Sequence, residues 1–217
     1  MVVLNELSGE RLRSMLAAGH DILECYRVLE RGGLNIVSEV LREGGSFYEW
    51  NHYPDGDIFD PDSHGQHYYH AHRDEEHGHF HTFLRQPGMP KGSRPVANKS
   101  KEKWPRGKDA PSHLIGISMD GYGFPIRLFT TNRWVTGECW YAADDVVAML
   151  DLFVIDHAAP SWPVNRWVSG MMQLFQPQIA ELVIERDATI EGWRQQHPER
   201  DVFEDRELDA TSALDIS

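Results

Sequence analysis

Histidine is the residue type that stands out in this sequence. Eight of the twelve histidines lie between positions 52 and 81, where an even spread over the chain would place about two. They include two alternating pairs, His70 with His72 and His79 with His81. In an extended strand, residues two apart share a face, so each pair presents both imidazoles to the same side. Neutral imidazole is a good ligand for zinc, iron and copper, so this pattern indicates a metal site.

The register of the two segments decides whether the pairs meet. A hairpin closed by two or four residues about Glu75 and Glu76 places His72 opposite His79, and His70 opposite His81. Directly opposed Cβ atoms lie about 4.5–5.5 Å apart, which is close enough for the imidazoles to converge on one ion. A loop of three or five residues would place the pairs on opposite faces. We therefore predict metal ligands at His70, His72, His79 and His81, with Fe or Zn as the ion.

Further residues are candidates for catalysis and for binding a substrate. Glu76, or an aspartate of the acidic loop 55–62, is predicted to complete the metal site. Arg133 lies among threonines, an asparagine and tryptophans, a combination that suits the binding of a small polar or anionic molecule. A salt bridge to one of the many acidic residues is the alternative for Arg133. We predict Glu76, His79 and Arg133 as catalytic residues of a metal-dependent enzyme, an oxygenase or a hydrolase.

Two local motifs resemble known families. His70-Ala71-His72, with Glu76 after it and Gly65 before it, resembles the first metal motif of cupins, whose histidine pair and glutamate bind iron, manganese or other ions. The run from His77 to Phe83 is similar to the histidine-triad signature of nucleotide hydrolases and transferases. That second resemblance implies a metal-free reaction in which His79 is the nucleophile on phosphorus.

The chain as a whole resembles an uncharacterised bacterial family to which no activity is attached. The resemblance rests on the segments FYEWNHYPDGD, YYHAHRDEEHGHFHTFLR and LFTTNRWVTGECWY. It implies no mechanism, so three hypotheses stay open. They are a metal-dependent enzyme, a histidine-triad-like nucleotide enzyme that uses His79, and a non-catalytic protein that binds a partner through the hairpin and a basic loop.

The elements that must position these residues follow from the hydrophobic pattern. Apolar residues three and four apart predict helices over 8–31 and 34–41, and again within 142–197, where Pro177 should divide a long span in two. Short aromatic and histidine-rich runs separated by turn residues predict strands near 47–53, 66–73, 78–85, 113–119, 125–132 and 134–141. The expected fold is α+β, with an antiparallel sheet of about five or six strands flanked by N-terminal and C-terminal helices.

This arrangement is expected to form a single domain over 1–217. Its parts are a helical region (1–45), the histidine-bearing sheet (46–141), C-terminal helices (142–197) and an acidic tail (198–217). The sheet region includes a long loop over 86–112 with seven basic residues, which could act as a lid, as a docking surface or as a solvated loop.

Composition narrows the possible functions. The formal net charge of -13 disfavours binding to nucleic acid, because it repels phosphate. Two cysteines, Cys25 and Cys139, are too few for a disulfide framework. No apolar run approaches the ~18 residues of a membrane span, and no signal peptide is recognisable, so we expect a cytoplasmic protein that does not bind membranes. The tryptophan-rich helices leave a homodimer possible.

Overall fold

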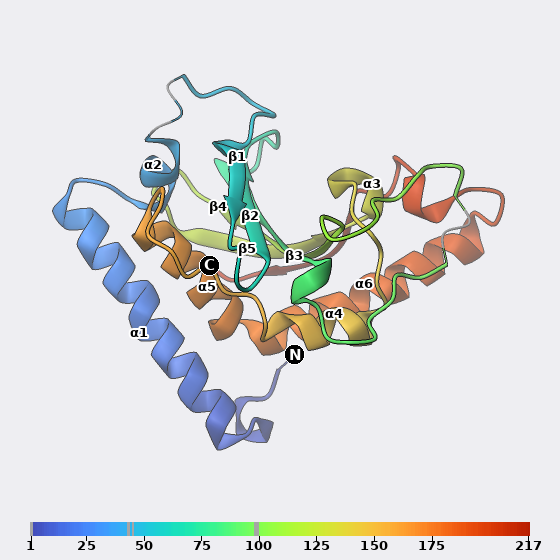
Figure 1. Ribbon diagram of the computed structural model, residues 1–217, viewed down its shortest axis with the longest axis horizontal. Helices are drawn as coiled ribbons and strands as arrows, with labels where there is room; N and C mark the ends of the chain where they lie inside the picture. The colour runs from blue at the N-terminus through green and yellow to red at the C-terminus, as the bar shows by residue number, and fades with distance from the viewer. Residues whose placement is uncertain (1, 43, 45, 98–99) are drawn as a thin grey trace.

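A computed structural model describes residues 2–42, 44, 46–97 and 100–217 and confirms the predicted α+β class. Its sheet has six strands in sequential order, and every neighbouring pair is antiparallel. The strands are β1 (Tyr53–Phe59), β2 (Gly65–His70), β3 (Gly78–Arg85), β4 (Pro111–Met119), β5 (Pro125–Thr131) and β6 (Ala210–Asp215). Figure 1 shows the strands crossing the centre of the molecule above several helices.

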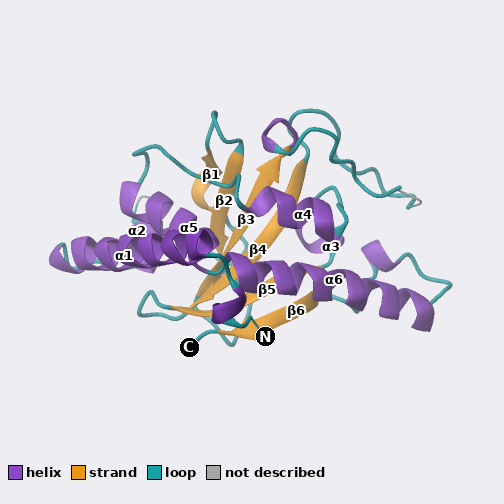
Figure 2. Ribbon diagram, turned by 90° about the horizontal axis from the view of Figure 1, so that it is seen from below, coloured by secondary structure: helices purple, strands orange, loops and turns teal. Residues whose placement is uncertain are grey.

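The helices precede and follow most of the sheet in the sequence. They are α1 (Gly9–Arg31), α2 (Ile36–Leu41), α3 (Arg133–Thr136), α4 (Ala143–Leu150), α5 (Trp162–Leu174) and α6 (Gln176–Gln196), with short 3-10 turns at Leu4–Glu6, Gln86–Gly88 and Val202–Glu204. The chain divides α5 from α6 beside Pro177, as predicted, because proline cannot donate the hydrogen bond that would continue the first helix. Viewed from below, α1, α5, α6 and α4 lie in front of the sheet (Figure 2).

The main core lies between the sheet and these helices. Phe80 of β3 is fully buried, and its ring centroid lies 5.5 Å from that of Trp167 in α5. Thr82, two residues further along β3, reaches the Sδ atom of Met172 in the same helix. Because side chains alternate along a strand, Phe80 and Thr82 face the helices, and His79 and His81 face away from them. No helix among the described residues has both the length and the apolar character needed to cross a membrane.

Two predicted strands differ from the structure. The strand predicted near 47–53 is wrong, since β1 begins only at Tyr53. The strand predicted over 134–141 is also wrong, because Asn132 accepts a hydrogen bond from the Arg133 backbone and starts α3 there. The left-handed φ of 66° at Gly137 then ends that helix.

The sixth strand comes from the segment predicted as an acidic tail. Strand β6 pairs with β5, and the hydroxyl of Thr130 hydrogen-bonds to those of Thr211 (2.8 Å) and Ser212 (2.6 Å). These contacts join residues some 80 positions apart in the sequence, so no local pattern announced them.

The long basic loop is anchored at its apolar residues. Trp104 is buried against Phe203, with ring centroids 5.5 Å apart, and the Val96 backbone donates to the Trp140 carbonyl. Six of the seven basic residues of this loop are exposed, and the seventh, Lys99, lies outside the described residues. The loop therefore packs on the protein through a few apolar side chains and presents its charges to solvent.

Candidate metal centre

The β2–β3 hairpin places the alternating histidines on one face of the sheet. His70 lies directly opposite His79, and Tyr68 lies opposite His81. The predicted register, with His72 opposite His79, is therefore wrong by two residues. A shift of two preserves the face of every side chain, because the period of a strand is two. The loop closed by the His70–His79 pair, 71–78, is longer than predicted but also even in length, so the histidines still share a face.

Three of the predicted ligands form what we call the three-histidine cluster: His70, His72 and His79. One ring nitrogen from each lies within 4.8 Å of the other two. The ring centroids are 4.4 Å apart for His70 and His79, 4.9 Å for His70 and His72, and 5.0 Å for His72 and His79. His72 lies two residues beyond His70, the last residue of β2, so it approaches from the loop end of the hairpin.

Two nitrogens of the cluster lack partners. The Nε2 atoms of His70 and His79 are buried and make no hydrogen bond to any described residue. A buried polar atom without a partner costs about 1–3 kcal/mol, so such atoms are uncommon in folded proteins. Coordination of a cation would satisfy both lone pairs, and the residues present therefore fit a metal ion.

Glu76 fixes the orientation of His79. The Nδ1 atom of His79 donates to Oε1 of Glu76. Burial acts to raise the pKa of the Glu76 carboxyl, but the hydrogen bond from His79 and the positive charge of Arg73 act in the opposite direction, and the pKa is lowered. The proton on Nδ1 leaves the Nε2 lone pair of His79 free. Glu76 thus lies behind the ring, in the place of a residue that orients a ligand, whereas the sequence indicated a metal ligand or a catalytic group.

His81 lies beside the three-histidine cluster and hydrogen-bonds to a histidine outside it. Its ring centroid lies 4.8 Å from that of His79 and 5.2 Å from that of His70. However, its Nδ1 shares a hydrogen bond of 2.9 Å with Nε2 of His113 in β4. The structure therefore brings His81 beside the other three predicted ligands but outside the group whose nitrogens converge. His113 was not predicted as part of the site, because it is an isolated histidine with no patterned neighbour.

Burial keeps these histidines neutral. Together with the neighbouring His79 and His72, it lowers the pKa of His70 to about 2. Burial likewise lowers the pKa values of His72, His79 and His81, and it lowers that of His113 to about 3. The rings are therefore uncharged at neutral pH, which is the form that binds metal ions.

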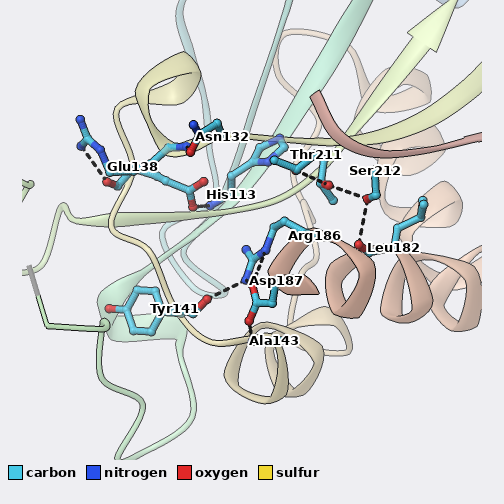
Figure 3. A network of polar contacts seen from close by, with 12 residues as sticks. His113, Asn132, Glu138, Tyr141, Ala143, Leu182, Arg186, Asp187, Thr211 and Ser212 are labelled. Atoms are coloured by element: carbon cyan, nitrogen blue, oxygen red, sulfur yellow. Dashed lines mark hydrogen bonds and ion pairs between the residues drawn. The ribbon is translucent and has the colours of Figure 1, made fainter. Parts of the chain in front are cut away.

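A buried carboxyl lies behind His113. The backbone N–H of His113 donates to Oε2 of Glu138 over 2.5 Å, as Figure 3 shows. Glu138 is fully buried, and burial raises its pKa to about 8. Glu138 therefore holds the start of β4, and through it the partner of His81.

Arg133 makes its contacts away from the three-histidine cluster. Its Nε atom lies 2.7 Å from Oε1 of Glu204, Nη1 donates to the Glu138 carbonyl (3.2 Å), and the guanidinium lies over the Trp104 ring. These contacts fit the salt-bridge alternative, and none of them reaches the three-histidine cluster. The cation beside the cluster is Arg73, whose Cζ lies 4.5 Å from the centroid of Phe129. The Phe129 ring is in turn 5.3 Å from that of His79.

The aspartates of the preceding loop stabilise turns. Asp60 is buried and accepts hydrogen bonds from the backbones of Asp62, Ser63 and Asp156. Asp57 accepts from Nδ1 of His52 (2.8 Å) and from the Gln66 amide (2.6 Å). Neither carboxylate belongs to the three-histidine cluster.

Two surface pockets flank the cluster. One, of about 630 Å³, is lined by His72, two arginines and four carboxylates, namely Arg73, Arg127, Asp74, Glu75, Glu76 and Asp215. We call it the hairpin pocket. The other, of about 760 Å³, lies on the residues before and within β1 and is lined by Tyr48, Trp50, His52, Asp55 and Asp57, among others. We call it the aromatic pocket.

Comparison with known proteins places the chain in a family without assigning an activity. No curated protein and no solved structure matches it. Residues 16–216 match the family described as Domain of unknown function (DUF6969), which confirms the resemblance to an uncharacterised family. Since the match covers nearly all of the sequence, the chain belongs to this family.

Proposed function

We propose that this protein binds a divalent metal ion, Fe or Zn, at the three-histidine cluster and is a metal-dependent enzyme of the oxygenase or hydrolase class. The observation that carries the proposal is the pair of buried, unpartnered Nε2 atoms of His70 and His79. Three protein ligands are typical of a catalytic site, because they leave a coordination position for water or substrate. A bound ion would supply Lewis acidity and activate water or oxygen there.

The surrounding residues of the chain prepare the cluster. Glu76 holds the proton of His79 on Nδ1 and keeps the ring in one orientation. The His81 ring packs against His79 and His70 and is held by its hydrogen bond to His113. Phe129 covers both His79 and His81, with ring centroids at 5.3 and 5.7 Å, and limits the access of water. Together these residues leave His72, which is only partly buried, as the most accessible of the three ligands.

The substrate we propose is a small polar molecule that enters through one of the two pockets beside His72. Arg133, the residue predicted to bind an anion, is paired with Glu204. In the hairpin pocket both arginines are already ion-paired, Arg73 with Asp209 (3.0 Å) and Arg127 with Asp215 (2.7 Å). The arrangement therefore gives no preference for an anionic substrate.

Metal titration tests the proposal. Chelator-treated protein should take up one equivalent of Co²⁺, used as a spectroscopic probe for the zinc or iron site, with ligand-field bands in the visible range. His70→Ala and His79→Ala should each abolish that binding, and His20→Ala, on the exposed surface of α1, should leave it unchanged. Binding that is weak, non-stoichiometric or unaffected by His79→Ala would refute the metal site.

A further inference from the structure

The aromatic pocket presents large aromatic side chains to solvent. Trp50 and Tyr48 are 67% and 62% exposed, among the highest values for large apolar residues in the described chain. Single exposed aromatic residues are common on protein surfaces, but these two line the same pocket. Packing in the folded chain accounts for only part of their surface, so the remaining surface is available to a ligand.

Trp50 is held in place although it is exposed. One face of its indole stacks on His72, with ring centroids 4.4 Å apart and an angle of 14° between the planes. Its backbone N–H donates to the Ala71 carbonyl (3.1 Å), and its φ of 72° lies in the left-handed region, which is costly for a bulky residue. The second face of the ring therefore stays open in a fixed orientation.

The charge of the pocket is negative. Asp55 and Asp57 line it, and among the residues that the structure describes neither lysine nor arginine does so. The partners of Asp57 are the imidazole of His52 and the amide of Gln66, and no lysine or arginine of the described chain pairs with this carboxylate. An aromatic face attracts a cation through its quadrupole, and a nearby carboxylate attracts the same charge. The combination is complementary to an organic cation.

The aromatic pocket is in contact with the three-histidine cluster. The His52 ring stacks on Tyr68 at 3.6 Å and lies 5.6 Å from the His70 ring, while Trp50 stacks on His72. A molecule bound against Trp50 and His52 would therefore lie one side chain away from two of the proposed metal ligands.

We propose that the aromatic pocket binds an alkylammonium group, held between the open face of Trp50, the Tyr48 ring and the carboxylates of Asp55 and Asp57. The assignment of this cation as part of the substrate rests on the proposed function. The binding of the cation itself does not, because it requires no metal.

Choline and its neutral isostere 3,3-dimethylbutan-1-ol provide a direct test, since they share size and shape and differ in charge. We expect chelator-treated protein to bind choline saturably at low ionic strength, with an indole signal of one tryptophan shifting in the NMR spectrum. The neutral alcohol should bind to the wild-type protein at least fivefold more weakly than choline does. Choline should bind to Trp50→Ala and to Asp55→Asn at least fivefold more weakly than to wild type. Each of these changes removes about 1 kcal/mol of attraction. Tyr122→Ala removes an even more exposed aromatic residue, in the β4–β5 turn, and should have no effect.

Equal binding of the alcohol and of choline would overturn the proposal, as would choline binding that Trp50→Ala and Asp55→Asn leave unchanged, or no binding at all. The same samples are titrated with Co²⁺ after choline is removed. Metal uptake without choline binding refutes the cation site alone, and choline binding without metal uptake refutes the metal site alone. Asp55→Asn, at an exposed position, keeps the test valid if Trp50→Ala fails to fold.

Discussion

The two faces of β3 are buried equally well but filled with different chemistry. Phe80 and Leu84 are fully buried against the helices, and His79 and His81 are almost fully buried on the opposite face. The helix-covered face gains stability from apolar contact. The opposite face contains imidazoles, and in this group the buried Nε2 atoms of His70 and His79 have no hydrogen-bond partner among the described residues. Apolar side chains could fill the same space without the free-energy cost of an unpaired polar atom. The difference indicates that the helix-covered face maintains the fold and that the histidine face is arranged to bind a ligand, which we propose is a metal ion.

The largest expected effect comes from the helix-covered face. Phe80→Ala should lower the free energy of unfolding by about 3–5 kcal/mol, because it removes a fully buried ring that packs on Trp167 and leaves a cavity. Chemical denaturation of chelator-treated protein measures this change. The adjacent substitution His79→Ala serves as the comparison and should destabilise the metal-free protein less. A larger loss for His79→Ala would show that the histidine face also maintains the fold.

His67 sharpens the comparison, because it places a histidine of β2 on the helix-covered face. Its Nε2 donates to Oδ1 of Asn165 (3.2 Å), and its buried Nδ1 has no partner among the described residues. Burial lowers the pKa of this imidazole to about 4. A proton on Nδ1 would find no acceptor there, so the folded protein resists protonation of His67.

The sign of the pH dependence follows. Between pH 6.5 and about 4 the unfolded chain binds the proton and the folded chain does not, so the stability that His67 contributes falls as the pH is lowered. The loss should reach about 2 kcal/mol between pH 7 and pH 5 and about 3 kcal/mol by pH 4. Other buried histidines add to the total, so the measurement is the difference in unfolding free energy between wild type and His67→Gln at each pH. Parallel curves for the two proteins would contradict the prediction, and His20→Gln is the exposed control.

The sequence predicted those parts of the fold whose signals are local. The helix predicted over 8–31 is α1, where Ser8 accepts from the Arg11 backbone and begins the helix, and the strand predicted near 78–85 is β3. The pairing of β6 with the sheet was not predicted, because its partners lie in β5, some 80 residues earlier in the chain. Local periodicity cannot report such a pairing.

The same division applies to the candidate site. Alternation in a strand was enough to predict which histidines share a face, and that inference survived a register error of two residues. The hydrogen bonds that His81 makes with His113, and Arg133 with its distant partners, depend on how separate strands and loops meet. No spacing within the sequence encodes those contacts, so the sequence assigned Arg133 to the site and missed His113.

The smallest expected effect comes from Glu76, and it tests whether this residue only orients the metal ligand His79 or is itself a ligand. Glu76→Gln should weaken Co²⁺ binding by about tenfold to a hundredfold, because a neutral amide holds the Nδ1 proton of His79 less firmly and lowers the basicity of Nε2. Glu75→Gln is the matched control, since Glu75 is exposed in the same loop. If Glu76→Gln instead abolished binding as completely as His79→Ala, Glu76 would be a metal ligand, as the sequence first indicated. An affinity equal to that of wild type would mean that packing alone orients His79, and the contrast between the two faces of β3 would then rest on His70, His72 and His79 without help from Glu76.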